Sequence, residues 1–144
     1  MSETVAKVRK GEARRQLGNR TGLTTGACCA AAAKAATLGL LCGEVPMKVA
    51  IRLPNGQEAS FDLIEGFLQG EGVARVAHAV IVKDGGDDPD ATHGAHMTAD
   101  VRLLPHRVDE IILKGGPGVG VVTKAGLGLE IGGPAINPVP KRNI

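Results

Sequence analysis

An alanine-rich stretch near the front of the chain is the strongest structural signal in the sequence. Seven of the ten residues at positions 27–36 are alanine, the residue with the highest helix propensity. Thr24 and Thr25 are N-cap candidates, Gly39 lies slightly early for a stop signal, and Gly43 is well placed to end the helix. We therefore expect a helix over residues 27–41, with side chains small enough for something to lie close against its backbone.

The segments after this helix show the alternation that is typical of strands. A β-hairpin is indicated by two alternating runs, joined by the tight turn signal Asn55-Gly56. Residues 65–72 carry no clear pattern and fit a loop, and the chain ends in a polar tail punctuated by prolines. The order of one helix followed by several strands predicts an α+β fold with a mixed, mostly antiparallel sheet and one long alanine-rich helix near the N-terminus. The expected strands are residues 47–53, 58–63, 75–83, 97–103 and 109–114.

Length and composition fit one domain. The chain has 144 residues, of which 43% are hydrophobic and 22% charged, close to ordinary globular usage. Residues 1–18 are polar and charged without periodicity, which predicts a flexible leader before a single domain over residues 19–144. The longest apolar run, residues 27–33, is too short to cross a membrane.

The cysteines and charges exclude several classes of protein. Three cysteines without a CxxC pair argue against a zinc site, and their odd number together with the lack of a signal peptide favours the cytoplasm. The basic run near the N-terminus is expected to be a solvated tail, with a nucleic-acid arm as the alternative. Because the chain has no tryptophan or tyrosine and no recognisable nucleic-acid motif, we expect no nucleic-acid partner.

The densest group of titratable side chains lies in the sequence KDGGDDPDATHGA at residues 83–95. Like charges this close repel, which raises the pKa of some of them or requires a cation. We expect Asp87 or Asp88 to orient His93, whose pKa near neutrality suits a general acid or base. The alternative is a solvated turn, because glycine, proline and aspartate are also common turn formers.

Metal binding is a second interpretation of this acidic loop, since His93 and His96 are spaced i, i+3 beside aspartates. The calcium-loop pattern fails and the zinc-helix pattern is absent, so we assign no metal ligand. A metal-dependent hydrolase remains the weaker function class. His78, on an apolar stretch, is expected to be a core histidine, and His96 and His106 to be surface residues.

Two glycine-containing segments are candidate anion sites. RTGLTTG leads from Arg20 into the helix, where free N–H groups, hydroxyls and an arginine can bind an anion, with a simple helix cap as the alternative. GGPGVGVVTK fails the phosphate-loop spacing, because Val121 stands where lysine is required, and fits glycine-rich turns. Lys34, two to three turns into the helix, is expected to face solvent.

Taken together, four ordered segments are far more specific than any one of them. They are RTGLTTGACCAAAAKAA, VKDGGDDPDATHGA, GGPGVGVVTKAGL and GGPAINPVPKRNI. With them the chain closely resembles the CbiD family of cobalamin biosynthesis, the cobalt-precorrin-5B (C1)-methyltransferases. The resemblance covers residues 20–144 and is most specific at residues 87–94 and 135–140.

The resemblance implies an enzyme that transfers a methyl group from S-adenosylmethionine to ring carbon C-1 of a cobalt-containing tetrapyrrole. Family members have two domains and are more than twice as long, so much of the expected methyl-donor site is missing here. The chain is then an N-terminal fragment or a divergent short member, and the alternative function is a truncated, non-catalytic tetrapyrrole-binding module. Its S-adenosylmethionine site is not assigned, no membrane partner is expected, and a homo-oligomer is left open.

A flat ring with many carboxylates needs cationic groups, N–H donors and a face where backbone comes close. We expect the helix start to bind a substrate carboxylate and the alanine face to lie against the ring. The catalytic candidates are His93, Asp87 and Asp88. The substrate-binding candidates are Arg20, Thr24, Thr25, Gly26, Lys83, Asp84 and Thr92.

Overall fold

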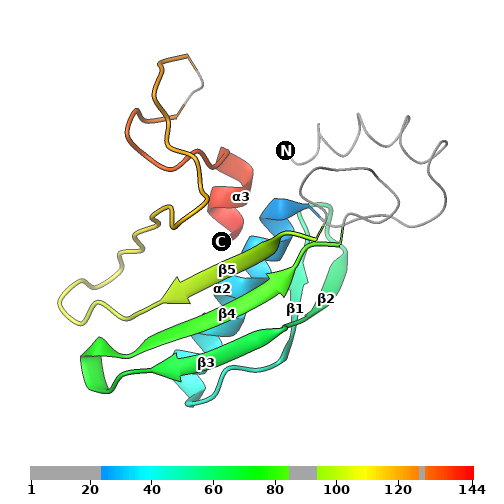
Figure 1. Ribbon diagram of the computed structural model, residues 1–144, viewed down its shortest axis with the longest axis vertical. Helices are drawn as coiled ribbons and strands as arrows, with labels where there is room; N and C mark the ends of the chain where they lie inside the picture. The colour runs from blue at the N-terminus through cyan, green and yellow to red at the C-terminus, as the bar shows by residue number, and fades with distance from the viewer. Residues whose placement is uncertain (1–23, 85–93, 127–128) are drawn as a thin grey trace, which may run out of the picture.

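A computed structural model describes residues 24–84, 94–126 and 129–144 of the protein (Figure 1). The leader expected over residues 1–18 lies outside these described residues. The elements are one long helix, five strands, a 3-10 turn and a short final helix. In chain order they are α2 (Thr25–Cys42), β1 (Lys48–Arg52), β2 (Glu58–Asp62), β3 (Glu65–Gln69), η1 (Gly72–Ala74), β4 (Val76–Val82), β5 (His96–Val101) and α3 (Pro138–Asn143).

The ends of α2 follow from its sequence. The Thr24 hydroxyl oxygen accepts a hydrogen bond from the Ala27 N–H at 3.0 Å, which satisfies one of the first N–H groups of the helix. At the other end Gly43 has a φ of 89°, and its N–H donates to the Gly39 carbonyl at 2.9 Å. The predicted helix and its stop are confirmed, and of the two N-cap candidates the cap is Thr24.

The strands form two antiparallel sheets. β1 pairs with β2 through the predicted turn, with Gly56 at a φ of 89°. The second sheet has the order β3-β4-β5, with every neighbouring pair antiparallel. The α+β class, the antiparallel pairing and the single long helix near the front are therefore as predicted.

The core lies between α2 and the three-stranded sheet. α2 crosses one face of this sheet and packs mainly against β4 and β5 (Figure 1). The alanines of α2 are buried against Ala77, Ala79 and Ile81, which alternate along β4 toward the helix. Because the side chains on both sides are small, helix and sheet come close together. The alanine face that we expected to receive a flat ring is therefore occupied by the sheet, and that expectation was wrong.

By length and composition alone, α2 could also cross a membrane. It has 18 residues and a mean hydropathy of 1.4. One such helix is weak evidence, because the core helix of a soluble protein passes the same test. The contacts of its alanines with β4 and β5 are those of a core helix.

Three segments differ from the sequence prediction. Residues 65–69, which carry no clear pattern and fitted a loop, form β3. Gly66 in this strand leaves room for Val45, because a Cβ on Gly66 would lie 2.7 Å from Val45 Cγ1. Residues 109–114, expected to be a strand, pair with no described strand, and Asp109 has a φ of 59° that interrupts the extended backbone. The proline-punctuated tail contains α3, in which Pro138 and Pro140 occupy the first turn, where the missing N–H has no helical partner to lose.

Candidate functional site

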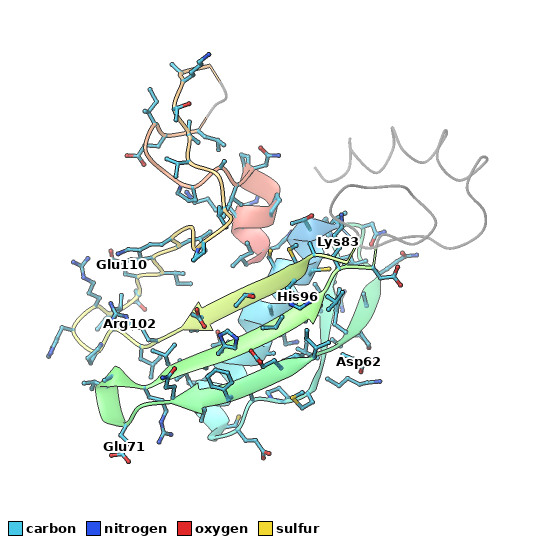
Figure 2. The ribbon with its side chains drawn as sticks, viewed as in Figure 1. Asp62, Glu71, Lys83, His96, Arg102 and Glu110 are labelled. Atoms are coloured by element: carbon cyan, nitrogen blue, oxygen red, sulfur yellow. The ribbon has the colours of Figure 1, made fainter. Side chains whose placement is uncertain are left out.

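Three of the four signature segments meet at one end of the molecule. They are the first turn of α2, the end of β4 at Lys83 and the helix α3 (Figure 1). Figure 2 shows Lys83 beside the beginning of α2, at the end of the strand that precedes the acidic loop. The segments are far apart in the sequence, so their meeting is a property of the fold.

Gly26 lies where α2 and α3 pack against each other. A Cβ built on Gly26 would lie 3.0 Å from Pro140 Cβ and 3.1 Å from Pro140 Cγ. Only a residue without a side chain therefore lets α3 pack on the first turn of α2. This contact joins the segment TTGACC to the segment AINPVP.

The first turn of α2 still presents hydrogen-bond donors. The Thr24 hydroxyl is engaged with its own helix, whereas Thr25 is exposed. Among the described residues, nothing accepts a hydrogen bond from the N–H of Thr25 or of Gly26. A helix N-terminus with such donors favours a negatively charged group.

Lys83 closes the neck of the acidic loop. Its N–H donates to the Ala95 carbonyl at 2.9 Å, and its carbonyl accepts from the Gly94 N–H at 2.8 Å. The residue is 3% exposed and is the buried charged residue of the described part of the chain. Asp84, which follows it, is exposed. The strands β4 and β5 therefore hold the start and the end of the loop together, as their predicted positions implied.

The neck of the loop and the first turn of α2 are close enough to interact electrostatically. Burial raises the pKa of the Cys28 thiol to about 11. Cys29 and Asp84 add to this rise in pKa, and the positive charge of Lys83 opposes it. Cys28, near the start of α2, is thus within electrostatic reach of both Lys83 and Asp84 at the start of the acidic loop.

Both cysteines of the first turn are neutral thiols in this environment. Burial also raises the pKa of Cys29, whose Sγ donates to Met97 Sδ on β5 at 3.8 Å. A thiol with a raised pKa is a poor nucleophile and a poor metal ligand, because the thiolate is the reactive form. The structural role of Cys28 and Cys29 is therefore packing, with Cys28 fully buried and Cys29 against Met97. No pattern in the sequence indicates the contact between Cys29 and Met97, which lie 68 residues apart.

Several predicted site residues lie outside the described part of the chain. They are Arg20, Asp87, Asp88, Thr92 and His93. Their roles remain predictions. Within residues 24–84, 94–126 and 129–144, no group of three His, Cys, Asp or Glu side chains could hold a metal ion.

His78 was expected in the core and is instead on the face of the sheet opposite α2. Its Nδ1 lies 2.6 Å from an oxygen of Asp100, its Nε2 lies 2.8 Å from an oxygen of Glu65, and its ring stacks on Phe67 with 4.6 Å between centroids. Burial lowers its pKa, but the two carboxylates outweigh burial and raise the pKa above the ordinary value. The three partners come from register across β3, β4 and β5, which the sequence pattern does not reveal.

The remaining candidates are largely where they were expected. Lys34 is exposed and donates from Nζ to the Ala50 carbonyl at 2.6 Å. His96 and His106 are exposed. The glycine-rich third segment contacts the fourth through the N–H of Ala135, which donates to the Gly120 carbonyl at 2.8 Å.

Comparison with known proteins agrees with these motifs. The chain matches the sequence model of the CbiD family over residues 12–144. It is 72% identical over 141 residues to the cobalt-precorrin-5B C(1)-methyltransferase of Dechloromonas aromatica, which covers 98% of this chain and 35% of that protein. It is 61% identical over 127 residues to the enzyme of the same name from Methylococcus capsulatus, with 88% of this chain and 32% of that protein covered. The protein of the same name from Polaromonas naphthalenivorans is 56% identical over 127 residues, with 88% of this chain and 34% of that protein covered.

The chain spans about a third of the length of the curated relatives it matches. No solved structure matches it.

Proposed function

The chain belongs to the CbiD family, and we propose that it forms the tetrapyrrole-binding part of a cobalt-precorrin-5B C(1)-methyltransferase. In this proposal a methyl group of S-adenosylmethionine is transferred to ring carbon C-1 of a cobalt-containing tetrapyrrole in cobalamin biosynthesis. Since the chain spans about a third of its relatives, we assign substrate binding to it and leave the complete reaction to the full length of the family protein. The alternative within this proposal is a binding module that holds the tetrapyrrole without methylating it.

The convergence of the helix start and the loop neck is the observation that supports this proposal. The substrate class carries several carboxylates, which require positive charge and N–H donors. The first turn of α2 supplies the N–H groups of Thr25 and Gly26, and Lys83 supplies a positive charge next to that turn. Because Lys83 is buried, its charge is screened less than a surface charge would be. We therefore propose that a substrate carboxylate binds between the first turn of α2 and Lys83.

In this proposal the acidic loop has a different task from the helix start. Its aspartates repel carboxylates, so the loop would not attract the rim of the ring. We propose that His93, oriented by Asp87 or Asp88, moves a proton during the reaction. The helix start contributes to catalysis by positioning the ring, because methyl transfer to carbon requires an in-line approach.

The methyl donor, S-adenosylmethionine, has no assigned place among the described residues. The hollow found in this part of the chain measures about 240 Å³ and is lined by Leu40, Gly72, Val73, Arg75 and Leu103. Leu40 lies about 21 Å along α2 from Gly26, at the rise of an α-helix. A donor bound in that hollow would be too far from a ring held at the first turn for a direct methyl transfer. We therefore assign no described residue to the methyl donor.

The proposal is tested by spectral titration of the chain with a cobalt-containing tetrapyrrole precursor. We expect saturable binding, and we expect Lys83→Met to weaken it by about tenfold, which corresponds to about 1.4 kcal/mol. Lys48→Met is the matched control, because Lys48 is an exposed lysine on β1 that pairs with Asp62 at 3.6 Å. Thermal melting of both variants shows whether the fold is retained.

The outcomes separate the alternatives. A methyl-transfer assay run beside the titration distinguishes a catalytic chain from a binding module, since the module binds without turnover. If the unmodified chain does not bind the precursor, or if Lys83→Met and Lys48→Met bind as tightly as it does, the proposed site is wrong.

A further inference from the structure

The segment after β5 exposes an unusual number of large apolar side chains. We call residues 103–126 and 129–131 the apolar arm. Figure 1 shows the chain turning beyond the end of β5, coming back toward α3 and then leading away from the helix and sheets, and Figure 2 labels Arg102 just before this arm and Glu110 on it. Ile111 is 95% exposed and Val108 is 82% exposed. The other large apolar side chains exposed on the arm are Leu103, Ile112, Val119, Val121 and Ile131.

Part of the arm has the sequence of a strand but no strand to pair with. Residues 109–114 read Asp-Glu-Ile-Ile-Leu-Lys, and isoleucine is among the residues most favoured in strands. No backbone hydrogen bond joins residues 108–115 to any other described residue. An extended segment with unpaired backbone groups and apolar side chains is a template for pairing with another sheet.

The arm contains one local ion pair, between Arg107 and Glu110, which leaves the backbone groups of residues 110–114 without a partner strand among the described residues. Arg107 donates to both carboxylate oxygens of Glu110 at 3.0 and 2.9 Å, which fixes the turn before the isoleucines. Within residues 107–114 two basic side chains balance two acidic ones. The surface that the arm offers is therefore apolar and close to neutral, and it suits a partner with an open sheet edge flanked by apolar side chains.

We propose that residues 110–114, which follow the positive φ of Asp109, form a β-strand against the part of the CbiD polypeptide that lies outside this chain. The relatives carry about two-thirds of their length outside the matched region, so each of them has a large second portion available to cover the arm. Apolar patches of several exposed side chains are uncommon on proteins without a partner. The inference rests on family membership and on the exposed arm, and it holds whether or not the tetrapyrrole site lies at the first turn of α2.

Hydrogen exchange of two proteins tests this inference. One is this chain, and the other is the full-length relative from Dechloromonas aromatica, which is 72% identical over the shared region. In this chain we expect the amides of residues 110–114 to exchange at the rate of an unfolded peptide. In the full-length relative we expect the aligned amides to be protected by about a hundredfold or more. The amides of β4 serve as the internal control, because they are paired on both sides and should be protected in both proteins.

Other results would overturn the inference. Fast exchange of the aligned amides in the full-length relative would show that the arm stays unpaired there. Protection of residues 110–114 in this chain alone, with a dimer detected by light scattering, would show that a second copy covers the arm instead.

A pair of substitutions gives an independent test in a fusion of this chain to the remaining portion of that relative. We expect Ile111→Asp to abolish the protection of residues 110–114 in the fusion, while leaving the melting temperature of this chain alone unchanged. Ile64→Asp is the control, since Ile64 is an isoleucine that is 53% exposed but lies between β2 and β3, outside the arm. Equal effects of the two substitutions in the fusion would contradict a specific contact at Ile111.

Discussion

Gly39 should be a position where the best helix former destabilises a helix. It lies in the last turn of α2, and a Cβ built on it would be 2.5 Å from Val45 Cγ2 and 3.1 Å from Val45 Cα. The Val45 side chain cannot simply rotate away, because a Cβ on Gly66 would already be 2.7 Å from its Cγ1. Val45 thus fills a slot between α2 and β3 that exists because both facing residues are glycine.

Two opposing effects decide whether Gly39→Ala raises or lowers the free energy of unfolding. Replacement of glycine by alanine inside a helix gains about 1 kcal/mol of stability. Forcing a methyl group into a packed site costs roughly 1–3 kcal/mol. Contact with the backbone Cα of Val45 places this site in the upper part of that range. We expect a net loss of about 1 kcal/mol in the free energy of unfolding, or about 3 °C in melting temperature for a chain of this size.

Urea denaturation of a double-mutant cycle with Val45→Ala measures the clash itself. Val45→Ala alone should cost about 2–3 kcal/mol, since it removes two methyl groups from a buried side chain and leaves a cavity. In that background the new methyl has room, so Gly39→Ala should stabilise the protein by about 1 kcal/mol. The coupling energy is then about 2 kcal/mol. If Gly39→Ala stabilises the protein equally in both backgrounds, Val45 is not what excludes a side chain at position 39.

Three further results are expected. Thr24→Ala should cost about 1 kcal/mol in urea denaturation, because it removes the N-cap hydrogen bond, whereas Thr25→Val should change stability by less than about 0.5 kcal/mol. The pKa of His78 is raised in the folded protein, so the stability that its charged form contributes is fully present below the unfolded pKa of about 6.5 and is lost as pH rises through the higher folded pKa. The difference in melting temperature between the protein and His78→Gln should therefore shrink with rising pH over that window, and a pH-independent difference would show that the imidazolium is not involved. In a thiol titration with a disulfide reagent, exposed Cys42 should react first and Cys28, with its pKa of about 11, only after unfolding; rapid reaction of two or more thiols in the folded protein would contradict this order.

Local signals in the sequence were enough for the elements that local chemistry determines. The start and stop of α2 depend on Thr24 and Gly43, which act within a few residues of the helix ends. The hairpin of β1 and β2 depends on alternation and on Asn55-Gly56. The neck of the acidic loop followed in turn from the predicted strands on either side of it.

The elements that the sequence could not predict depend on distant partners. Glycine is typical of loops, yet Gly66 lies in β3. A larger residue at this position would clash with the Val45 side chain, which is distant in the sequence. The isoleucines at 111 and 112 look like a strand, yet a strand also needs a neighbour, and the described residues provide none. The same limit applies to His78, whose neighbours Glu65 and Asp100 are set by register across three strands.

Burial of the alanine face of α2 against the sheet limits where a ligand can contact this helix. The seven alanines at positions 27–36 suggested that small side chains along α2 made room for a ring, but β4 and β5 take that room. A ligand can then approach the helix backbone only where the sheet does not cover it, and Pro140 already covers Gly26 on one side of the first turn. What remains is the pair of N–H groups at that turn and the charge of Lys83 beside it. In the signature segments, alanine and glycine therefore bring the elements together, and a few polar groups lie where these elements meet.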